Sequence, residues 1–172
     1  MTPRGVLYHV VCAAPAASDA ETFVRMAQAE GWRVCVIATP MGLRFIDAPR
    51  LAELTGERVR TDFRMPDEPD ERPPADAVVV APATFNTINK WATGLADSFA
   101  VSLLCELMGF GVPIVAAPLL KDALARHPAF ANNVETLRGA GVRVLFDPAA
   151  PPHARMPPWH RILTELGDIF DG

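Results

Sequence analysis

Residues 75–100, ADAVVVAPATFNTINKWATGLADSFA, decide the fold of this chain. Residues 77–81 form an unbroken apolar run of strand length, and Pro82 is expected to end that strand. Hydroxyl and amide side chains follow directly: Thr84, Asn86 and Thr87. In open parallel sheets, ligands bind outside the carboxyl ends of the strands. The stretch therefore predicts a buried strand that runs into a helix through the site of a nucleotide-like cofactor.

The rest of the chain alternates between apolar runs and helical patterns. Further strands are expected at residues 5–12, 34–38, 112–116 and 142–146, with a short edge strand at 59–63. Helices are expected from Ser18 to Gly31, as two short pieces within 43–54, after Thr84 with a break near Gly94, and over 97–108, 119–126, 128–138 and 158–170. Strands that alternate with helices predict an α/β fold, a doubly wound, Rossmann-like parallel sheet with helices on both faces.

Two proline-rich segments are predicted to be loops. Residues 65–74 contain four prolines among acidic residues, which excludes a helix or a central strand. Residues 148–158 are interpreted as a surface arm, because only one helix is expected after them. No internal repeat or linker divides the chain, so residues 1–172 are expected to form a single domain.

Composition limits the classes of partner. The chain has 172 residues and a formal net charge of -4, and it lacks a Lys/Arg cluster, so nucleic acid is not an expected partner. No apolar run approaches the roughly 18 residues that a membrane-spanning helix needs, so no membrane association is expected. The N-terminal segment is interpreted as a first core strand rather than a signal peptide, and the expected location is cytoplasmic.

Cysteines and histidines show no metal-binding spacing, and no metal site is predicted. The cysteines lie in apolar segments and are expected to be free core residues rather than disulfide partners: Cys12, Cys35 and Cys105. His9 lies among the apolar residues of the first strand and is expected to be a core or interface residue. The other histidines are scattered near prolines: His127, His153 and His160.

Residues 75–97 resemble the flavoprotein family of homo-oligomeric flavin-containing cysteine decarboxylases. The family pattern, AD-apolar-AP-x-[ST]-x-N-T-x-x-K-x-x-x-G-[IL]-[AC]-D, is matched in order by Ala75, Asp76, Ala81, Pro82, Thr84, Asn86, Thr87, Lys90, Gly94, Leu95, Ala96 and Asp97. Residues 154–162 resemble the family's Gly-Arg-Met tail pattern. The resemblance implies a doubly wound α/β fold, noncovalent FMN, a small-molecule substrate, and a homo-oligomer that is a trimer or an assembly of trimers.

The resemblance also implies which residues contact the flavin. The family's hydroxyl-x-Asn-Thr turn corresponds to Thr84, Phe85, Asn86 and Thr87. Further contacts are implied after the other strands, at Ala13 and Ala14 in the first turn, at Thr39 after the second strand, and at Leu119 in the segment that corresponds to the family's Pro-Ala-Met-Asn motif.

The first turn departs from the family pattern. The family carries Gly-Ser-Ile-Ala-Ala there, whereas this chain carries Ala-Ala-Pro-Ala-Ala over residues 13–17. Pro15 removes one N–H group and Asp19 adds a negative charge, and both changes disfavour a bound phosphate. Ser18 is the candidate replacement for the missing hydroxyl, although with Glu21 it also matches a helix capping box. FMN is therefore expected to bind weakly or in a shifted pose.

The positions that correspond to the family's catalytic residues differ as well. The family's histidine has no counterpart in residues 66–72, where Glu68 is nearest by spacing and is expected to be solvated. Lys121 replaces the asparagine of the substrate motif; it has the charge to pair with an anion, and the simpler expectation is an exposed residue at a helix start. The family's clamp cysteine has no counterpart between Asp147 and Arg155. Cysteine decarboxylation of the family type is not expected.

Two further matches have alternative interpretations. Trp91 is interpreted as a core residue of an amphipathic helix, with stacking on a flavin or a neighbouring subunit as the alternative. Asp97 is interpreted as a helix cap, with a subunit contact as the alternative.

Three hypotheses for function remain. The first is an FMN-binding flavoprotein that carries out redox chemistry on an unknown small substrate, as an oxidoreductase or an atypical lyase. The second is a cofactor-poor oligomeric scaffold or regulatory subunit, favoured by Ala14, Pro15 and the missing histidine. The third is an atypical decarboxylase in which Glu68, or a histidine from a neighbouring subunit, enters the pocket.

Overall fold

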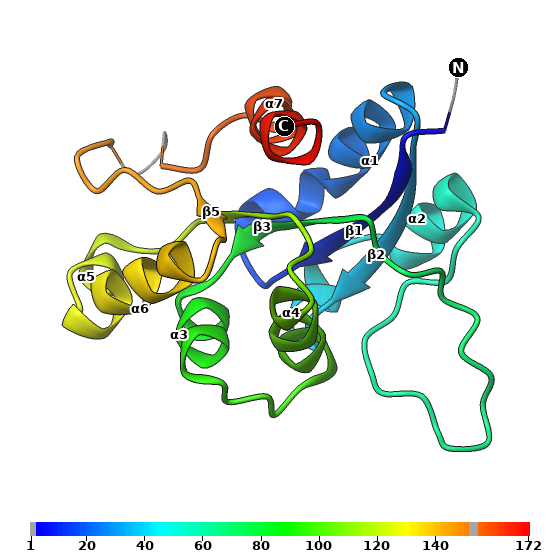
Figure 1. The fold of residues 1–172 in the computed structure, drawn as a ribbon, viewed down its shortest axis with the longest axis horizontal. Helices are drawn as coiled ribbons and strands as arrows, with labels where there is room; N and C mark the ends of the chain where they lie inside the picture. The colour runs from blue at the N-terminus through cyan, green and yellow to red at the C-terminus, as the bar shows by residue number, and fades with distance from the viewer. Residues whose placement is uncertain (1–2, 152–154) are drawn as a thin grey trace.

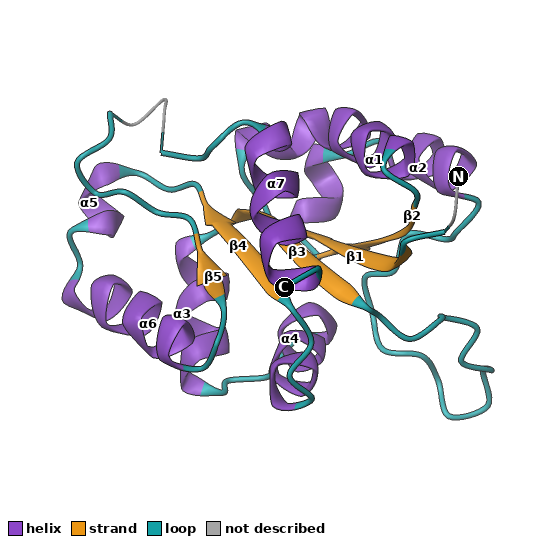
Figure 2. Cartoon of the chain, turned by 45° about the horizontal axis from the view of Figure 1, so that its top comes forward, coloured by secondary structure: helices purple, strands orange, loops and turns teal. Residues whose placement is uncertain are grey.

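A five-stranded parallel sheet forms the middle layer of the protein, whose computed structural model describes residues 3–151 and 155–172 (Figures 1 and 2). The strands are β1 (Gly5–Val11), β2 (Trp32–Ala38), β3 (Ala77–Ala83), β4 (Ile114–Pro118) and β5 (Arg143–Val144). Their order is β2-β1-β3-β4-β5, and every neighbouring pair is parallel. The predicted doubly wound α/β sheet is confirmed. His153 and Ala154, which belong to two sequence predictions, lie outside the described residues.

Helices cover both faces of this sheet (Figure 1). Helices α1 (Ala20–Ala29), α2 (Ala48–Thr55) and α7 (Trp159–Phe170) pack on one face. Helices α3 (Phe85–Thr93), α4 (Phe99–Gly109) and α6 (Pro128–Gly139) pack on the other. Three short helices, η1 (Pro15–Asp19), η2 (Gly42–Phe45) and α5 (Asp122–Ala125), follow β1, β2 and β4 respectively. No helix among the described residues is both long enough and apolar enough to span a bilayer.

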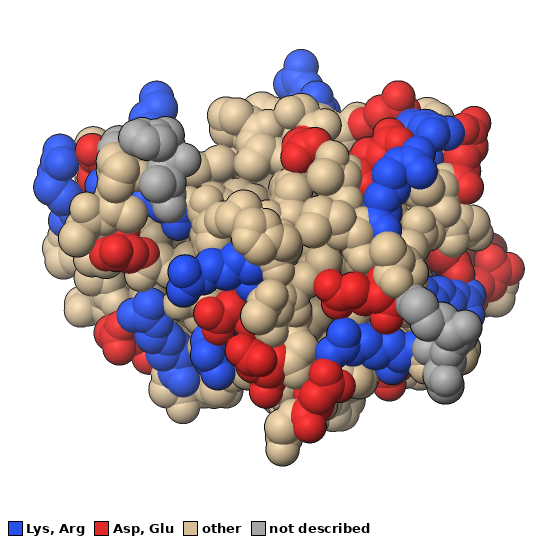
Figure 3. Space-filling view, turned by 90° about the horizontal axis from the view of Figure 1, so that it is seen from above, with Lys and Arg blue, Asp and Glu red and all other residues tan. Residues whose placement is uncertain are grey.

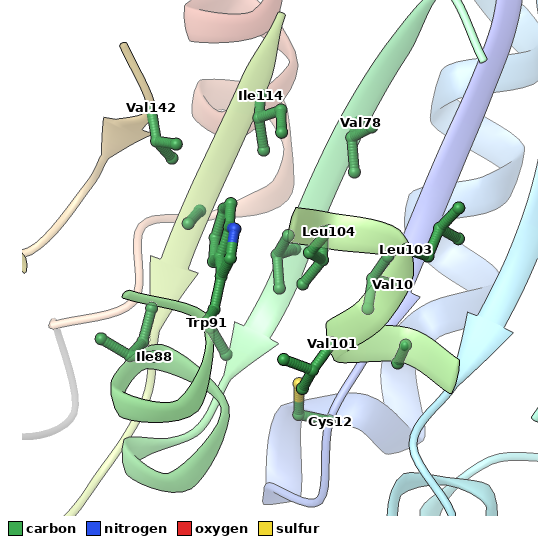
Figure 4. Packing of buried hydrophobic residues seen from close by; sticks show 14 of the residues in the cluster. Val10, Cys12, Val78, Ile88, Trp91, Val101, Leu103, Leu104, Ile114 and Val142 are labelled. Atoms are coloured by element: carbon green, nitrogen blue, oxygen red, sulfur yellow. The ribbon is translucent and has the colours of Figure 1, made fainter. Parts of the chain in front are cut away.

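The apolar run in β3 is buried on both faces, as its composition predicts. Val78 and Val80 pack towards α3 and α4, whereas Val79 packs towards α1 and α7. A strand with helices on both sides has no solvent-facing positions, which is why the run does not alternate with polar residues. Trp91, only 1% exposed, packs beside this strand (Figure 4). The prediction that Trp91 is a core residue is confirmed.

The carboxyl end of β3 corrects one prediction. The strand does not stop at Pro82 but continues through a cis Ala81–Pro82 peptide bond to Ala83. Proline lacks only a donor, and the carbonyls still pair: the Pro82 oxygen accepts from the Cys12 N–H at 3.1 Å, and the Ala83 oxygen from the Leu119 N–H at 2.9 Å. These bonds hold β1 and β4 to the end of β3.

Three other elements are shorter than predicted. The edge strand at 59–63 reduces to one bridge between Ile37 and Arg60. The helix at 119–126 begins only at Asp122, because the Leu119 N–H still bonds the Ala83 carbonyl of β3 and the Lys121 backbone is extended. The strand at 142–146 reduces to β5, because the Val142 N–H bonds the Leu137 carbonyl at the end of α6. Residues 65–74, and the described part of 148–158, contain neither helix nor strand, as predicted.

Two helix starts were also predicted wrongly. Ser18 forms no capping box: its hydroxyl donates to the Pro15 carbonyl within η1, and α1 begins two residues later. Asp97 does not cap α4, which begins after Ser98; its carboxylate lies 2.6 Å from Lys90 Nζ. The cysteines are free, as predicted, and burial raises the pKa of the Cys12 and Cys35 thiols.

Charged side chains of both signs are intermixed on the face that carries α1 and α7 (Figure 3). Many of them form ion pairs, such as Arg25 with Glu21 at 2.6 Å and Arg143 with Glu165 at 3.0 Å. Pairs this exposed each contribute little to stability. The apolar layers on both sides of the sheet therefore hold the fold together.

His9 is a fully buried polar residue of β1, as predicted for a core histidine. Its Nε2 atom lies 2.8 Å from the Ala81 carbonyl oxygen, and its ring packs 4.3 Å from the ring of Phe23 between centroids. A carbonyl only accepts, so Nε2 carries the proton and donates. Burial lowers the pKa of His9 from 6.5 to about 4.

We predict that His9 makes the fold sensitive to acid. Between pH 6.5 and 4 the unfolded chain binds a proton at this residue and the folded chain does not, so stability falls as the pH falls through this window. From pH 7.5 to 5 the loss is about 2 kcal/mol. Urea unfolding of His9→Gln, which keeps a donor but does not titrate, should lack this loss, whereas the exposed His160→Gln should retain it. Equal acid sensitivity in all three proteins would contradict the assignment.

Candidate functional site

The predicted site residues all follow strand ends at one edge of the sheet. Ala13 and Ala14 follow β1, Thr39 follows β2, residues 84–87 follow β3, and Leu119 follows β4. Because the strands are parallel, these ends lie at the same edge. Besides the two bonds at the end of β3, the Thr39 N–H bonds the Val11 carbonyl at 3.0 Å. The structure thus brings the predicted residues to the carboxyl edge of the sheet.

A network of small polar groups fixes the turn after β3. Thr84 caps α3: its hydroxyl oxygen accepts from the Thr87 N–H at 3.3 Å and lies 3.2 Å from the Thr87 hydroxyl. The Cys12 thiol donates to the same Thr87 hydroxyl at 3.4 Å. Thr87 is only 4% exposed, so its side chain fixes the turn rather than offering a free polar group.

Asn86 is the side chain of this turn that remains available. It is exposed and makes no side-chain hydrogen bond with any residue that the structure describes. Its neighbour Phe85 is half-buried and packs against the rings of His127 and Phe130, at centroid distances of 5.7 and 6.2 Å. The N–H groups of Phe85 and Asn86 lie in the first turn of α3, where a helix has no internal acceptors for them.

The turn after β2 lies close to the end of β1. The Thr39 hydroxyl accepts from the Gly42 N–H at 2.9 Å. A Cβ atom at Gly42 would lie 2.5 Å from the Val11 carbonyl oxygen, so only glycine permits this contact. The turn exposes three large apolar side chains that the sequence analysis missed: Met41, Leu43 and Phe45. A clue was available, since these residues surround a glycine in a segment too short to bury them.

The turn after β1 disfavours a bound anion less than its sequence suggests. The Asp19 carboxylate accepts from Trp159 Nε1 at 2.7 Å and from the Thr22 hydroxyl, so its negative charge is engaged by α7 and α1. Ser18 does not replace the missing family hydroxyl, because it is bonded within the turn. The N–H groups of Ala13 and Ala16 have no acceptor among the described residues.

Glu68, Lys121 and His127 each have a different local setting. Glu68 is exposed, as predicted, and accepts from the Met65 N–H at 3.0 Å; it shares a hollow of about 390 Å³ with Leu43 of η2. Lys121 is exposed immediately before α5, as predicted. His127 caps α6 by accepting from the Ala129 N–H at 3.1 Å.

A doubly wound sheet with small polar turns at its carboxyl edge defines an α/β protein of the kind that binds nucleotide-like cofactors. The chain belongs to the Flavoprotein family, whose model matches residues 7–169. The family-level resemblance found in the sequence is thereby confirmed.

Curated relatives extend beyond the length of this chain. The coenzyme A biosynthesis bifunctional protein CoaBC of Mycobacterium bovis is 39% identical over 134 residues, which cover 76% of this chain and 31% of that protein. CoaBC of Bacillus subtilis is 33% identical over 113 residues, which cover 62% of this chain and 27% of that protein. The chain thus spans about a third of the length of the curated relatives it matches.

Solved structures share the fold over nearly the whole chain. A mutant PPC decarboxylase complexed with pantothenoylaminoethenethiol superposes with a TM-score of 0.82 at 18% identity, covering 98% of this chain and 99% of that one. The FMN-dependent cysteine decarboxylase TvaF gives 0.75 at 22% identity, with 98% and 99% coverage. The FMN-binding protein AtHal3 gives 0.82 at 18% identity, with 98% and 97% coverage.

We predict that removing the Thr84 hydroxyl destabilises the protein. Thr84→Ala should lower the free energy of unfolding by about 1 kcal/mol, because the Thr87 N–H loses its acceptor. Ser98→Ala is the matched control, since Ser98 occupies the same position before α4 but makes no capping bond through its side chain. Urea unfolding of both variants measures the difference; equal losses would show that the Thr84 hydroxyl is not a stabilising cap.

Proposed function

We propose that this chain is an FMN-binding flavoprotein related to the cysteine decarboxylases, which carries out redox chemistry on a small substrate. The observation that carries the proposal is the carboxyl edge of the sheet. Its turns present N–H groups and the Asn86 amide, which have no partner among the described residues, together with exposed apolar side chains. Membership of the Flavoprotein family supports a flavin as the ligand. Fold relatives that are FMN-dependent or FMN-binding support FMN in particular.

The groups at this edge fit the chemistry of FMN. The phosphate needs backbone N–H donors, and Ala13, Ala16 and the first turn of α3 supply them. The flavin ring is a flat apolar surface with a polar rim. The exposed Met41 side chain suits the ring surface, and the Thr39 hydroxyl and the Asn86 amide suit its rim. Phe85, Thr87, Ala14 and Leu119 complete the proposed contacts, and Thr87 acts by holding the turn.

Bound FMN would supply the capacity to accept or donate electrons. The residues of this chain would bind and orient the flavin and limit access of water to it. The family's histidine, asparagine and clamp cysteine have no counterparts at the corresponding positions. We therefore propose an oxidoreductase or an atypical lyase acting on a small substrate, rather than a typical cysteine decarboxylase.

The proposed assembly is a homo-oligomer, either a trimer or an assembly of trimers, in the cytoplasm. Exposed apolar residues near the carboxyl edge support a covering partner copy: Met41, Leu43, Phe45, Phe63 and Met65. Leu43, Phe63 and Met65 border one hollow, and exposed apolar surface of this kind is characteristic of protein interfaces.

The second candidate is a cofactor-poor scaffold or regulatory subunit. Pro15 favours it, because proline removes one donor from the turn nearest the proposed phosphate position. The third candidate is an atypical decarboxylase. The hollow that Glu68 shares with Leu43 favours it, because this hollow places the carboxylates of Glu68 and Asp62 beside the turn after β2.

We predict that the purified protein binds FMN and shows the visible absorbance of a flavin. Asn86→Asp should weaken FMN binding at least tenfold, because a carboxylate removes the amide donor and adds a charge of the same sign as the phosphate. The control is Asn132→Asp on the exposed surface of α6, which should bind as the wild type does.

Absorbance and fluorescence titrations with FMN, with circular dichroism to verify folding, measure the effect. Failure of the wild type to bind FMN at high micromolar concentration would favour the scaffold hypothesis. Normal binding by a folded Asn86→Asp variant would exclude the proposed contact.

A further inference from the structure

A second positively charged site lies along the outer side of β2. Most arginines of this protein are ion-paired, including Arg4, Arg25, Arg33, Arg50, Arg138, Arg143 and Arg155. By contrast, the guanidinium groups of Arg58 and Arg60 make no ion pair or hydrogen bond within residues 3–151 and 155–172. The nearest carboxylate oxygen to Arg72 is Asp70 Oδ2, 3.8 Å from Nη2 and beyond hydrogen-bond distance.

Arg72 is held rigidly although its charge is poorly compensated. Its guanidinium lies 5.5 Å from the ring centroid of Tyr8 and 5.2 Å from that of Phe99. Its Nε and Nη1 atoms are buried without any acceptor among the described residues. Nη2 is the accessible nitrogen of this partly buried guanidinium, and its ion pair with Asp70 is long, so Nη2 is the position at which an anion would bind.

The three arginines line one hollow. Arg58, Arg60 and Arg72 border a hollow of about 90 Å³ against Cys35, Val36 and Ile37 of β2. A cavity needs only about 10–15 Å³ to hold one water molecule, so a tetrahedral or planar oxyanion has room here. Arg60 and Arg72 also border an adjoining hollow of about 180 Å³ that includes Arg64 and Ser102.

The backbone fixes Arg60 at the rim of this hollow. Its N–H donates to the Val36 carbonyl at 3.1 Å, and its own carbonyl accepts from the Ala38 N–H at 2.9 Å. The long segment between α2 and β3 thereby meets the edge strand β2 at Arg60 before it loops away from the sheet (Figure 1). The hollow therefore lies along the side of β2, whereas the proposed flavin site lies beyond the ends of the strands.

Nearby carboxylates only partly neutralise these cations. Glu57 borders the first hollow but is bonded by Arg33, with Nε 2.9 Å from Oε1. Glu71 also borders it and is exposed. Asp70 and Glu106 border only the adjoining hollow. The first hollow thus combines three arginines with a single carboxylate, Glu71, that is not paired elsewhere.

We propose that Arg58, Arg60 and Arg72 form a binding site for a small oxyanion, the phosphate or carboxylate group of a metabolite. Arg72 provides a fixed charge through its accessible Nη2, and Arg60 and Arg58 close on the anion from the rim.

The test is an anion titration of the full chain. The folded protein, saturated with FMN so that its phosphate positions at the carboxyl edge are filled, is titrated with inorganic phosphate or with acetate at constant ionic strength, with chloride as reference. Isothermal titration calorimetry gives the affinity, and thermal melting provides an independent measure. The variants are Arg60→Gln, Arg58→Gln and Arg72→Gln, with Arg25→Gln, which lies on α1, as the control.

Saturable binding of phosphate or acetate, weakened about tenfold or more by Arg60→Gln and unchanged by Arg25→Gln, is the expected result. The anion that binds more tightly identifies a phosphate-bearing or a carboxylate-bearing ligand. Arg58→Gln and Arg60→Gln carry the test if Arg72→Gln does not fold, since neither residue makes a side-chain contact that folding requires. If FMN does not bind, the same titration without FMN still tests this site through Arg60→Gln.

Two results would overturn the proposal. The first is a wild-type response no larger than that to chloride, or one that Arg60→Gln leaves unchanged. The second is a change in oligomeric state in the arginine variants without any anion binding by the wild type. That result would show that these arginines pair with a second copy of the chain.

Discussion

The parallel pairing of β1 with β3 at the centre of the sheet is the constraint on which the rest of the structure depends. It joins residues about seventy positions apart, with Leu7 opposite Ala77 and Val10 opposite Val80. Because β2 lies on one side of β1 and β4 on the other side of β3, the chain reverses its direction across the sheet at this pair. The crevice of a doubly wound fold lies at such a point. The pairing of β1 with β3 therefore determines both the fold and the position of the candidate site.

The sequence predicted the central strand β3 and helix α3 well, but it predicted the ends of several outer elements poorly. The uniformly apolar run in β3 can belong only to a strand covered on both faces, and Trp91 falls on the buried side of α3. Several wrong predictions involve groups bonded outside the element that was predicted. The Leu119 N–H bonds the distant Ala83 carbonyl of β3, and the Val142 N–H bonds the Leu137 carbonyl at the end of the preceding helix. Local propensity carries no information about such partners.

Prediction of the candidate site was limited in the same way. Residue types and spacing identified the turn after β3, because hydroxyl and amide side chains there are visible in the sequence. They did not show that Asp19 would be engaged by Trp159, a residue 140 positions away. Nor did they show that the Thr87 hydroxyl would be hydrogen-bonded to Thr84 and Cys12. Which polar groups remain free for a ligand is decided by tertiary contacts.

The segment between α2 and β3 carries the arginines of the proposed oxyanion site. Glu68 is nearest by spacing to the histidine of the family pattern, and Arg58, Arg60 and Arg72 border the hollow beside β2. A histidine near its usual pKa transfers protons, whereas a guanidinium stays charged and recognises oxyanions. The three arginines therefore offer a ligand permanent positive charge, which suits anion recognition and not proton transfer. The oxyanion proposal rests on this charge beside β2, and the flavin proposal rests on the turns beyond the strand ends.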